Sequence, residues 1–398
     1  MPPGPFAVTV LGAGIAGSAL AFHLAKRDVG PVLLFDPSTP AAGATGRAAG
    51  IVTDQLWNPW DVAVAQEAQA EYAGLCARHD PSAYTQNGFV RWTASQAAAD
   101  AMEAAADRLK GWGVSVDRVG PSELARALPW GRFDDVLLGL RGRTDAVVTP
   151  STLTAIYVHE ASALGVQCQF GEPMARLRWS PGSTQLKVGA ATFTSQRLVV
   201  AAGAWSKRIL ADLGRPLPLL PYRTQAATLR PPTAPPLDFP SGHDIDSDVY
   251  FRPEGPGRIL AGNGTEAVEA DPDRFQPQGD ERFLVHLAES FESRLPGWAS
   301  CGLVRAWAGV CTATPDRRPL VGAVPRAPDL FVLAGFNGFG VMRAGAVARR
   351  LADRIVDGPD GAADEALRPV SPARFADPLA AFLPRPGFTL EPGENPRF

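Results

Sequence analysis

The feature that most constrains this chain is a run near its N-terminus, VTVLGAGIAGSALAFHLA over residues 8–25, that lacks lysine, arginine and carboxylates. It could be a membrane span, a signal peptide, or a strand and a helix joined by a glycine turn. A signal peptide begins with a basic stretch, but the first lysine here is Lys26, beyond the run. A spanning helix of about 20 residues would hardly carry Gly12, Gly14 and Gly17 in its middle. We therefore expect two elements here, and neither a span nor a signal peptide.

The two expected elements are a strand over Phe6–Leu11 and a helix over 16–26, joined by G-A-G-I-A-G. In a dinucleotide-binding fingerprint the first glycine permits a tight turn, the second lets the backbone approach a pyrophosphate, and the third lets the helix pack on the strand. The diphosphate then lies at the helix N-terminus, where free N–H groups favour an anion. A second apolar run ends at Asp36, the position at which an acidic residue binds the ribose hydroxyls. No arginine that could bind the 2′-phosphate of NADP stands beside Asp36, which disfavours NADP. This context predicts a nucleotide-binding unit rather than a chance glycine cluster.

Length and composition set broad limits on the protein. At 398 residues the chain exceeds one usual domain, so two domains are expected. Hydrophobic residues make up 45% and charged residues 20%, as in soluble globular proteins, and a net charge of −3 gives no field for gripping nucleic acid. The 4 cysteines and 5 histidines show no metal-ligand spacing. We expect a soluble, cytoplasmic protein with reduced thiols, no metal site, no nucleic-acid partner and no membrane span.

A second loop favours a flavin over a nicotinamide dinucleotide. Residues 43–51, directly after the second strand, read GATGRAAGI. The longer ribityl diphosphate of FAD requires further backbone N–H donors, a hydroxyl and a counter-charge, and Thr45 and Arg47 fit the last two roles. A solvated surface turn is the alternative, because clusters of Gly, Ala and Thr are common in loops.

Two later stretches suit the same cofactor. The strand over 198–201 ends in small residues that would let the backbone lie against it. Residues 334–343 read AGFNGFGVMR directly before a helix. The N–H groups and positive dipole end of that helix, aimed at the N1–C2 carbonyl edge of a flavin, would stabilise the negative charge of its reduced form. A plain loop with a glycine hinge is the alternative.

The remaining pattern predicts helices and strands in a mixed order. The helices are expected over 61–78, 97–112, 121–128, 149–164, 282–293 and 343–356, and the strands over 88–93, 166–170, 174–179, 185–188, 198–201, 224–229, 249–252, 259–261 and 330–334. Nucleotide-type elements thus recur at the start, middle and end, with antiparallel material inserted twice between them. This predicts an α/β fold: a Rossmann-like FAD-binding domain from three separated segments (1–85, 140–215 and 300–375), a mostly antiparallel substrate domain (86–139 and 216–299), and a C-terminal tail (376–398).

Together these blocks resemble the D-amino-acid-oxidase-like (DAO) superfamily of FAD-dependent enzymes, especially the branch of glycine oxidase, sarcosine oxidase and dimethylglycine dehydrogenase. The resemblance spans roughly residues 1–370 and rests on V-x-V-x-G-A-G-I-A-G, G-A-T-G-R-A-A-G, V-V-A-A-G-A-W-S, Y-F-R-P-E-G, W-A-G-V-C-T-A-T-P-D and A-G-F-N-G-F-G. It implies FAD, and removal of a hydride from a carbon that bears an amine. The residues expected to bind FAD are Gly12, Gly14, Ile15, Ala16, Gly17, Asp36, Pro37, Gly43, Ala44, Thr45, Arg47, Ala49, Gly50, Ile51, Met174, Ala202, Gly203, Trp205, Gly309, Phe336, Asn337, Gly338, Phe339, Gly340, Val341 and Met342.

Both carboxylate anchors that are usual in this branch are missing from the matching positions. Glycine oxidases place an arginine where Cys311 stands, and sarcosine oxidases place a lysine where Met342 stands. A buried carboxylate needs a cationic or multi-donor partner. The candidates are Arg252, Arg343, Arg47 and Arg223. We predict Tyr250 and Arg252 as the catalytic pair, since alternation puts them on one face of a strand; a solvent-exposed arginine is the alternative.

Two further departures concern the flavin. Sarcosine oxidases attach flavin through a cysteine at the position of Gly309, so we expect non-covalent FAD. They also place a lysine at the position of Leu260, where its positive charge assists reaction with oxygen. Its loss here favours a dehydrogenase over an oxidase, with an electron acceptor that the sequence does not name.

The sequence therefore predicts oxidation of a small-molecule secondary or tertiary amine, or of an amino acid resembling glycine, sarcosine or proline, to an imine. A flavin hydroxylase is one alternative, although no second nucleotide-binding glycine motif for NADPH is present. An FAD-binding assembly factor or structural subunit, with weak or lost amine oxidation, is the other, because the anchors are missing. Trp57, Trp60 and Trp307 could wall an apolar pocket, although packing is their commoner role.

Overall fold

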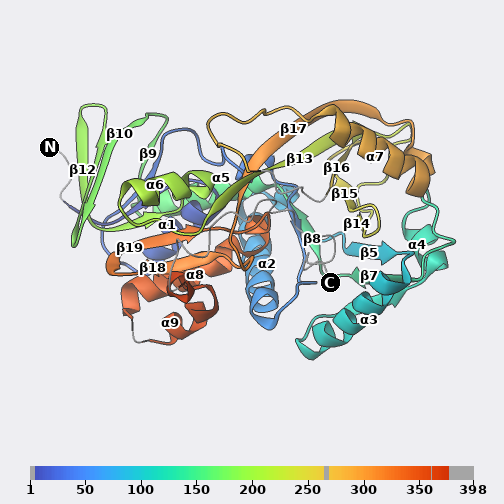
Figure 1. Cartoon of the computed structure of the whole chain (residues 1–398), viewed down its shortest axis with the longest axis horizontal. Coiled ribbons are helices and arrows are strands. Elements are labelled where there is room, and N and C mark those ends of the chain that lie inside the picture. The colour runs from blue at the N-terminus through green and yellow to red at the C-terminus, as the bar shows by residue number, and fades with distance from the viewer. Residues whose placement is uncertain (1–4, 264–268, 360, 376–398) are drawn as a thin grey trace.

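Two large sheets organise the chain, as the computed structural model shows for residues 5–263, 269–359 and 361–375 (Figure 1). The first sheet contains β1 (Phe6–Leu11), β2 (Val32–Asp36), β9 (Gln167–Phe170), β10 (Met174–Ser180), β11 (Ser183–Val188), β12 (Ala191–Val200), β18 (Leu320–Val324) and β19 (Ala327–Ala334). The second contains β5 (Phe89–Thr93), β6 (Val116–Val119), β7 (Leu138–Gly142), β13 (Leu220–Arg230), β14 (Ser241–Asp244), β15 (Val249–Pro253), β16 (Ile259–Asn263) and β17 (Gly302–Ala313). The predicted α/β fold, with a parallel core and a mostly antiparallel second sheet, is confirmed.

The parallel core of the first sheet runs in the order β9-β2-β1-β12-β19. Its inner strands β1, β2 and β19 are largely apolar on both faces, as expected of a sheet that is covered on both sides, whereas the edge strand β9 is half-buried. The helices α1 (Ile15–Lys26), α2 (Pro59–His79), α5 (Pro150–Ala163) and α8 (Gly340–Asp357) contribute to the core on one face, and α6 (Ser206–Asp212) contributes to the core on the other. Strands β10 and β11 add an antiparallel hairpin beside β12.

The fingerprint glycines are required by close backbone contacts. Gly12 adopts φ +112°, and a Cβ atom there would lie 2.5 Å from the carbonyl oxygen of Ala201. A Cβ atom on Gly17 would lie 1.9 Å from the carbonyl oxygen of Gly12. Only glycine lets α1 approach β1, and β1 approach the end of β12, this closely.

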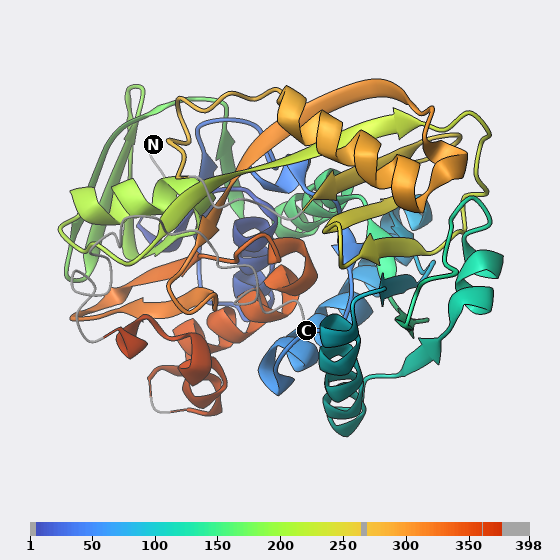
Figure 2. The same cartoon turned by 45° about the vertical axis from the view of Figure 1, so that its right-hand side comes forward.

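The second sheet runs in the order β17-β13-β16-β15-β14-β5-β7-β6. In Figure 2, β13 and β17 extend side by side across the top of the molecule, and α7 (Glu281–Arg294) lies beside their outer ends. One face of this sheet packs against α7 through an apolar cluster that includes Trp92, Phe251, Phe283 and Phe291. Because side chains alternate along a strand, the neighbours of Phe251, Tyr250 and Arg252, point to the opposite face.

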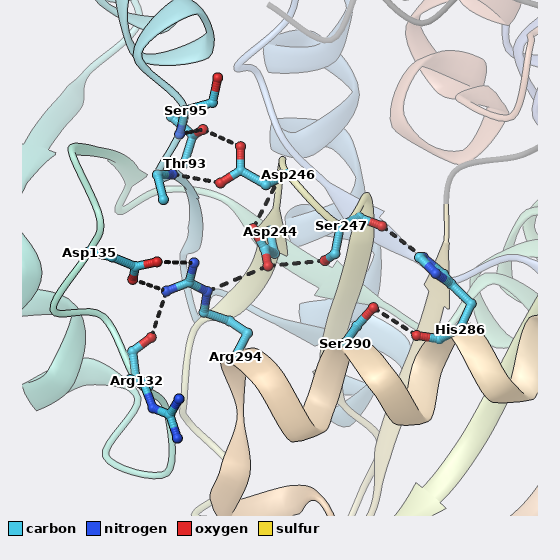
Figure 3. Close-up of polar contacts among 11 residues, drawn as sticks. Thr93, Ser95, Arg132, Asp135, Asp244, Asp246, Ser247, His286, Ser290 and Arg294 are labelled. Carbon is cyan, nitrogen blue, oxygen red and sulfur yellow. Dashed lines mark hydrogen bonds and ion pairs between the residues drawn. The ribbon is translucent and has the colours of Figure 1, made fainter.

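A polar network joins the C-terminal end of α7 to the second sheet and to the 132–135 turn (Figure 3). Arg294 lies 2.6 Å from Asp135 through Nη1 and 3.6 Å from Asp244 through Nε. Ser247 donates to Asp244 at 3.0 Å, and burial is the main cause that raises the pKa of that carboxyl. The network thus connects α7 and the 132–135 turn to one face of the second sheet.

A third, small sheet joins segments from the two large ones. It consists of β3 (Ile51–Val52), β8 (Ala146–Val148) and β4 (Tyr84–Thr85), in the order β3-β8-β4. Along the chain, α3 (Gln96–Gly111) connects β5 to β6, and α4 (Pro121–Ala127) lies between β6 and β7. The helix α9 (Ala362–Leu367) follows α8. Within the described ranges, no helix is long and apolar enough to cross a membrane.

Several elements differ from the sequence-based expectation. The predicted elements occur, but several others were not predicted, and most of these are short and lack a clear alternation: β3, β4, β6, β7, β8, β14, β17, β18, α6 and α9. The segment 302–313 was assigned to the FAD-binding part, yet β17 pairs with β13 along its length and belongs to the second sheet. The helix expected from 343 begins at Gly340. The proposed domain boundaries otherwise stay a prediction, and the tail 376–398 lies outside the described residues.

We predict that Gly17→Ala destabilises the fold. The added methyl group must displace the Gly12 carbonyl or the helix, and such overpacking costs about 1–3 kcal/mol. The matched control is Gly111→Ala at the end of α3, where a Cβ atom would meet nothing within 4 Å among the described residues. Thermal and urea unfolding of both variants, each saturated with FAD, should lower the midpoint of Gly17→Ala alone. Equal midpoints would show that α1 is not held by this contact.

Candidate functional site

The candidate site lies where five neighbouring strands of the first sheet end. Segments 12–17, 37–51, 171–174, 201–205 and 335–340 follow the carboxyl ends of β1, β2, β9, β12 and β19, which are adjacent in the sheet. In open α/β sheets, ligands bind in the crevice outside these strand ends. All the residues predicted to bind FAD belong to these segments, except Asp36, which is the last residue of β2, and Gly309, Val341 and Met342.

The first of these segments presents a helix N-terminus. Gly14 is the N-cap of α1, and no side chain caps this helix end. Gly14 and Ala16 keep part of their surface exposed. The amide of Ile15 donates to Thr45 Oγ1 at 3.1 Å, which brings the second loop against the first. Asp36 accepts from the amide of Ala13 at 2.8 Å, so its carboxylate lies beside the glycine turn. The arrangement fits a diphosphate at the helix end and a ribose beside Asp36.

The second loop is folded on itself by Arg47. Its Nη1 donates to the carbonyl oxygens of Ala42 and, at 3.0 Å, Gly43. The stem of Arg47 covers Gly309, where a Cβ atom would lie 3.1 Å from Arg47 Cδ. Trp307 donates to the carbonyl oxygen of Arg47 at 3.0 Å. Arg47 and Trp307 therefore connect the loop to β17, and this packing explains the glycine at position 309.

The third and fourth segments have accessible backbone. Gly203 adopts φ +52° and is exposed, and a Cβ atom there would meet nothing within 4 Å of the described residues. Ala202 is half-buried, while Trp205 donates to Asp273 at 2.7 Å. Met174, at the start of β10, packs against the apolar core of the first sheet. The small residues at 202–203 therefore keep the backbone accessible at this strand end.

The glycine-rich loop at 335–340 is bound to the end of β17. The amide of Asn337 donates to the carbonyl oxygen of Thr312 at 2.9 Å, and its side chain accepts from the amide of Thr314 at 3.1 Å. Asn337 and Gly338 both adopt positive φ, +54° and +83°. These contacts fix the loop immediately before the first turn of α8.

Arg343 of α8 supports the same loop through a hydrogen bond. Its side chain is 1% exposed, forms an ion pair with the buried Asp61, and donates to the carbonyl oxygen of Phe336 at 3.0 Å. A carboxylate could reach it only by displacing Asp61 from a buried pair. Arg343 is therefore a support for the loop.

The polar face of the second sheet lies opposite these segments. Tyr250 pairs with Gly262 across β16, and a Cβ atom on Gly262 would lie 2.3 Å from the Tyr250 hydroxyl, so glycine makes room for the ring. Arg252 pairs with Leu260, which confirms that Tyr250 and Arg252 share a face. Arg252 donates through Nε to the carbonyl oxygen of Ala49 and through Nη1 to Pro253 at 2.6 Å. It thus connects the substrate face to the FAD loop.

The four arginine candidates are in different surroundings. Arg223 is bound to the 276–280 segment, 2.8 Å from Asp280 and 2.6 Å from the carbonyl oxygen of Gln278. Arg47 and Arg343 support loops, as described above. Arg252 alone lies beside Tyr250, and its Nη2 is 3.9 Å from Glu254. A guanidinium carries five N–H donors, so these contacts leave Arg252 with further donor capacity.

Of the tryptophans Trp57 and Trp60, only Trp57 contacts a segment of the site. The Trp57 ring contacts the Phe339 ring edge to face, with centroids 4.8 Å apart, and joins the loop after β3 to the glycine-rich loop. Trp60 donates to the carbonyl oxygen of Ala366 at 2.8 Å, on the side of α9, and does not join the site.

Sequence reasoning missed three side chains on the polar face. They are Arg91 on β5, Tyr222 on β13 and His243 on β14. The Tyr222 hydroxyl lies 3.3 Å from the position of a Cβ atom on Gly338. The alternation in FVRWT places Arg91 opposite to Val90 and Trp92, but a sequence does not show which strand will lie beside it.

Burial changes the acidity of three side chains on this face. It raises the pKa of Tyr250 to about 12 and that of Cys311 to about 11, and it lowers the pKa of Arg91 to about 10. All three residues nevertheless keep some solvent-accessible surface. No group of three or more metal-ligating side chains occurs among the described residues.

Comparison with known proteins identifies the family. The family model of FAD-dependent oxidoreductases named DAO matches residues 7–354. Dimethylglycine dehydrogenase of Rattus norvegicus is 24% identical over 383 residues, and human sarcosine dehydrogenase is 25% identical over 377 residues. Both alignments cover 88% of this chain but only 43% and 40% of those proteins, so the chain spans about two fifths of their length. The L-proline dehydrogenase of P. horikoshii superposes with a TM-score of 0.86 at 22% identity, over 94% of this chain and 98% of that one.

The strand-end segments, with their accessible glycines and helix N-terminus, fit the cofactor of this family. FAD is accordingly the cofactor, and the chain belongs to the DAO family of FAD-dependent oxidoreductases.

Proposed function

We propose that this chain oxidises a secondary or tertiary amine, or an amino acid, to the corresponding imine. The observation that carries the proposal is the position of Tyr250 and Arg252, which share a desolvated face of β15, where Arg252 contacts the FAD segment through Ala49. When bound, FAD accepts the hydride from the carbon next to the nitrogen. Relatives named for dimethylglycine, sarcosine and proline support this substrate class, since each of these compounds is a secondary or tertiary amine that carries a carboxylate.

The residues of the chain would orient the substrate and exclude water. We assign the carboxylate to Arg252, because its guanidinium is buried and a charge-assisted hydrogen bond is stronger in such surroundings of low polarity. Tyr250 stays protonated at any physiological pH because burial raises its pKa, so it acts as a neutral donor. The N-terminus of α8, which follows the 335–340 loop, places N–H groups where they stabilise added negative charge. No side chain has to act as a nucleophile.

A second candidate function is an FAD-binding subunit without amine oxidation. All four candidate anchors, Arg47, Arg223, Arg252 and Arg343, are bound to backbone or to carboxylates of this chain. Anaerobic mixing with a panel of amines separates the two functions. Loss of the visible flavin absorption with any amine supports the oxidoreductase, and a flavin that no amine reduces supports the subunit.

We predict that the purified protein is yellow and releases its FAD on denaturation with acid or heat. Arg47 packs over Gly309, where relatives attach the flavin, and the raised pKa of Cys311 keeps that thiol protonated and unreactive. The measurement is the partition of flavin between supernatant and precipitate. Flavin that remains with the precipitated polypeptide would contradict non-covalent binding.

We predict that Arg252→Met weakens an amino-acid substrate much more than the matched amine without the carboxylate. Loss of a charge-assisted bond in a desolvated site is worth a few kcal/mol, or about a hundredfold in apparent affinity. The matched control is Arg305→Met, because Arg305 also lies near Glu254, at 3.6 Å, but is largely exposed. Reductive half-reactions of both variants give the affinities. Equal losses for both compounds would assign Arg252 a structural role through Ala49.

We predict a dehydrogenase rather than an oxidase. Leu260 is 1% exposed and apolar, and the cation opposite it, Arg252, is the residue that we assign to the substrate carboxylate. Position 260 therefore supplies no positive charge of its own for the reaction with oxygen. Stopped-flow mixing of the substrate-reduced enzyme with air-saturated buffer should reoxidise it slowly, and mixing with an artificial dye should do so rapidly. Equal rates with stoichiometric hydrogen peroxide would overturn this assignment.

A further inference from the structure

Two consecutive residues of α2 connect the two helices whose N-termini border the FAD crevice. The helices α1, α2, α5 and α8 share one apolar core on the same face of the first sheet (Figure 1). Oε1 of Glu71 in α2 lies 3.2 Å from Nε2 of His23 in α1. The hydroxyl oxygen of Tyr72, the next residue, accepts a hydrogen bond from the backbone amide of Gly345 in α8 at 3.0 Å. Helix α2 is therefore a common reference for the positions of α1 and α8.

Glycine at position 345 permits this contact. A Cβ atom there would lie 2.8 Å from Tyr72 Cε1, 2.7 Å from the hydroxyl oxygen of Tyr157 and 3.0 Å from Glu71 Oε1. Both tyrosines are fully buried. Their rings can reach the α8 backbone only because residue 345 has no side chain.

The groups around this contact are ordered by hydrogen bonds from several helices. Tyr157 of α5 donates to Glu71 of α2. Burial opposes the charge of this carboxylate, but the hydrogen bonds from His23 and Tyr157 lower the pKa of Glu71, so it stays ionised. Burial raises the pKa of Tyr72, so its hydroxyl stays protonated and neutral. Directional bonds thus connect α2 to α1, α5 and α8 in addition to apolar packing.

The contact lies close to the end of α8 that follows the glycine-rich loop. The helix begins at Gly340, and the five residues from there to Gly345 span about 7.5 Å along its axis. Arg343, two residues before Gly345, forms the ion pair with Asp61, which also belongs to α2. Helix α2 therefore binds the first two turns of α8 twice, at the end of the helix that lies near the cofactor.

We propose that Tyr72 is a positioning residue for the flavin, which acts by fixing the N-terminus of α8 relative to α1. This inference rests on the proposed role of that N-terminus toward reduced FAD, and not on which amine is oxidised. The stabilisation of negative charge by a helix dipole falls off within the first turn. A small displacement of α8 would therefore weaken the binding of reduced, negatively charged FAD more than the binding of oxidised FAD.

Tyr72→Phe tests the proposal, because it removes the hydroxyl group and keeps the ring. The midpoint potential of the bound FAD should become more negative. We expect the equilibrium constant for two-electron reduction to fall about twofold to fivefold, which corresponds to about 9 to 21 mV. The potential of the holoenzyme is measured by anaerobic reduction with dithionite in the presence of a reference dye. A general loosening of the fold that affects oxidised and reduced FAD equally would leave this potential unchanged.

The matched control is Tyr84→Phe. Tyr84 of β4 packs against the same apolar core, and it forms no hydrogen bond with α8 among the described residues. This variant should keep the wild-type potential. Equal potentials of the wild type and Tyr72→Phe, or equal shifts in the two variants, would overturn the inference.

Gly345→Ala changes the same contact from the side of α8. The added methyl group must displace the Tyr72 ring or the helix, so the potential should shift in the same direction. In the double variant the two shifts should not add, because both changes act on one contact. Additive shifts would contradict the proposal, and if one single variant does not fold, the other still decides. Because dithionite replaces the substrate, each outcome is reached whether or not the protein oxidises amines.

Discussion

The contact of Gly17 with the carbonyl group of Gly12 is the constraint on which the site depends. It sets the distance of α1 from β1, and the matching contact of Gly12 with Ala201 sets the distance between the ends of β1 and β12. Backbone groups can converge here only because side chains are missing. The helix N-terminus, the loop of Thr45 and the turn at Gly203 then meet around one crevice. A single methyl group at Gly17 would separate surfaces that come from distant parts of the chain.

Arginine holds this arrangement together. Arg47 closes the second loop, Arg343 supports the glycine-rich loop, and Arg252 joins the substrate face to the FAD loop, in each case through backbone carbonyl oxygens. A guanidinium suits this role because its five donors lie in a fixed plane and its charge persists on burial. Burial and charge therefore do not distinguish an arginine that supports a loop, such as Arg343, from one proposed to bind a substrate, such as Arg252.

The sequence predicted those parts of the site that are set by local backbone requirements. Gly12, Gly17 and the apolar strands around them specify the β1–α1–β2 unit, and the small residues after β12 and β19 mark further strand ends. The pairing of β17 with β13 could not be predicted, because the two strands are separated by a long insertion and their register depends on tertiary packing. Arg91 was missed for the same reason. Arg343 was a reasonable anchor by position, but its buried pairing with Asp61, from a distant helix, is visible only in three dimensions.

The order of strands in the first sheet has a consequence for biosynthesis. β1 emerges from the ribosome long before its neighbour β12, which begins at Ala191, and β12 in turn pairs with β19 near residue 330. Contacts so distant in sequence are slow to form, and the strand edges stay open until they do. The nascent chain therefore carries an incomplete flavin crevice for most of its synthesis. The complete crevice can therefore receive FAD only after β19 has emerged and paired with β12.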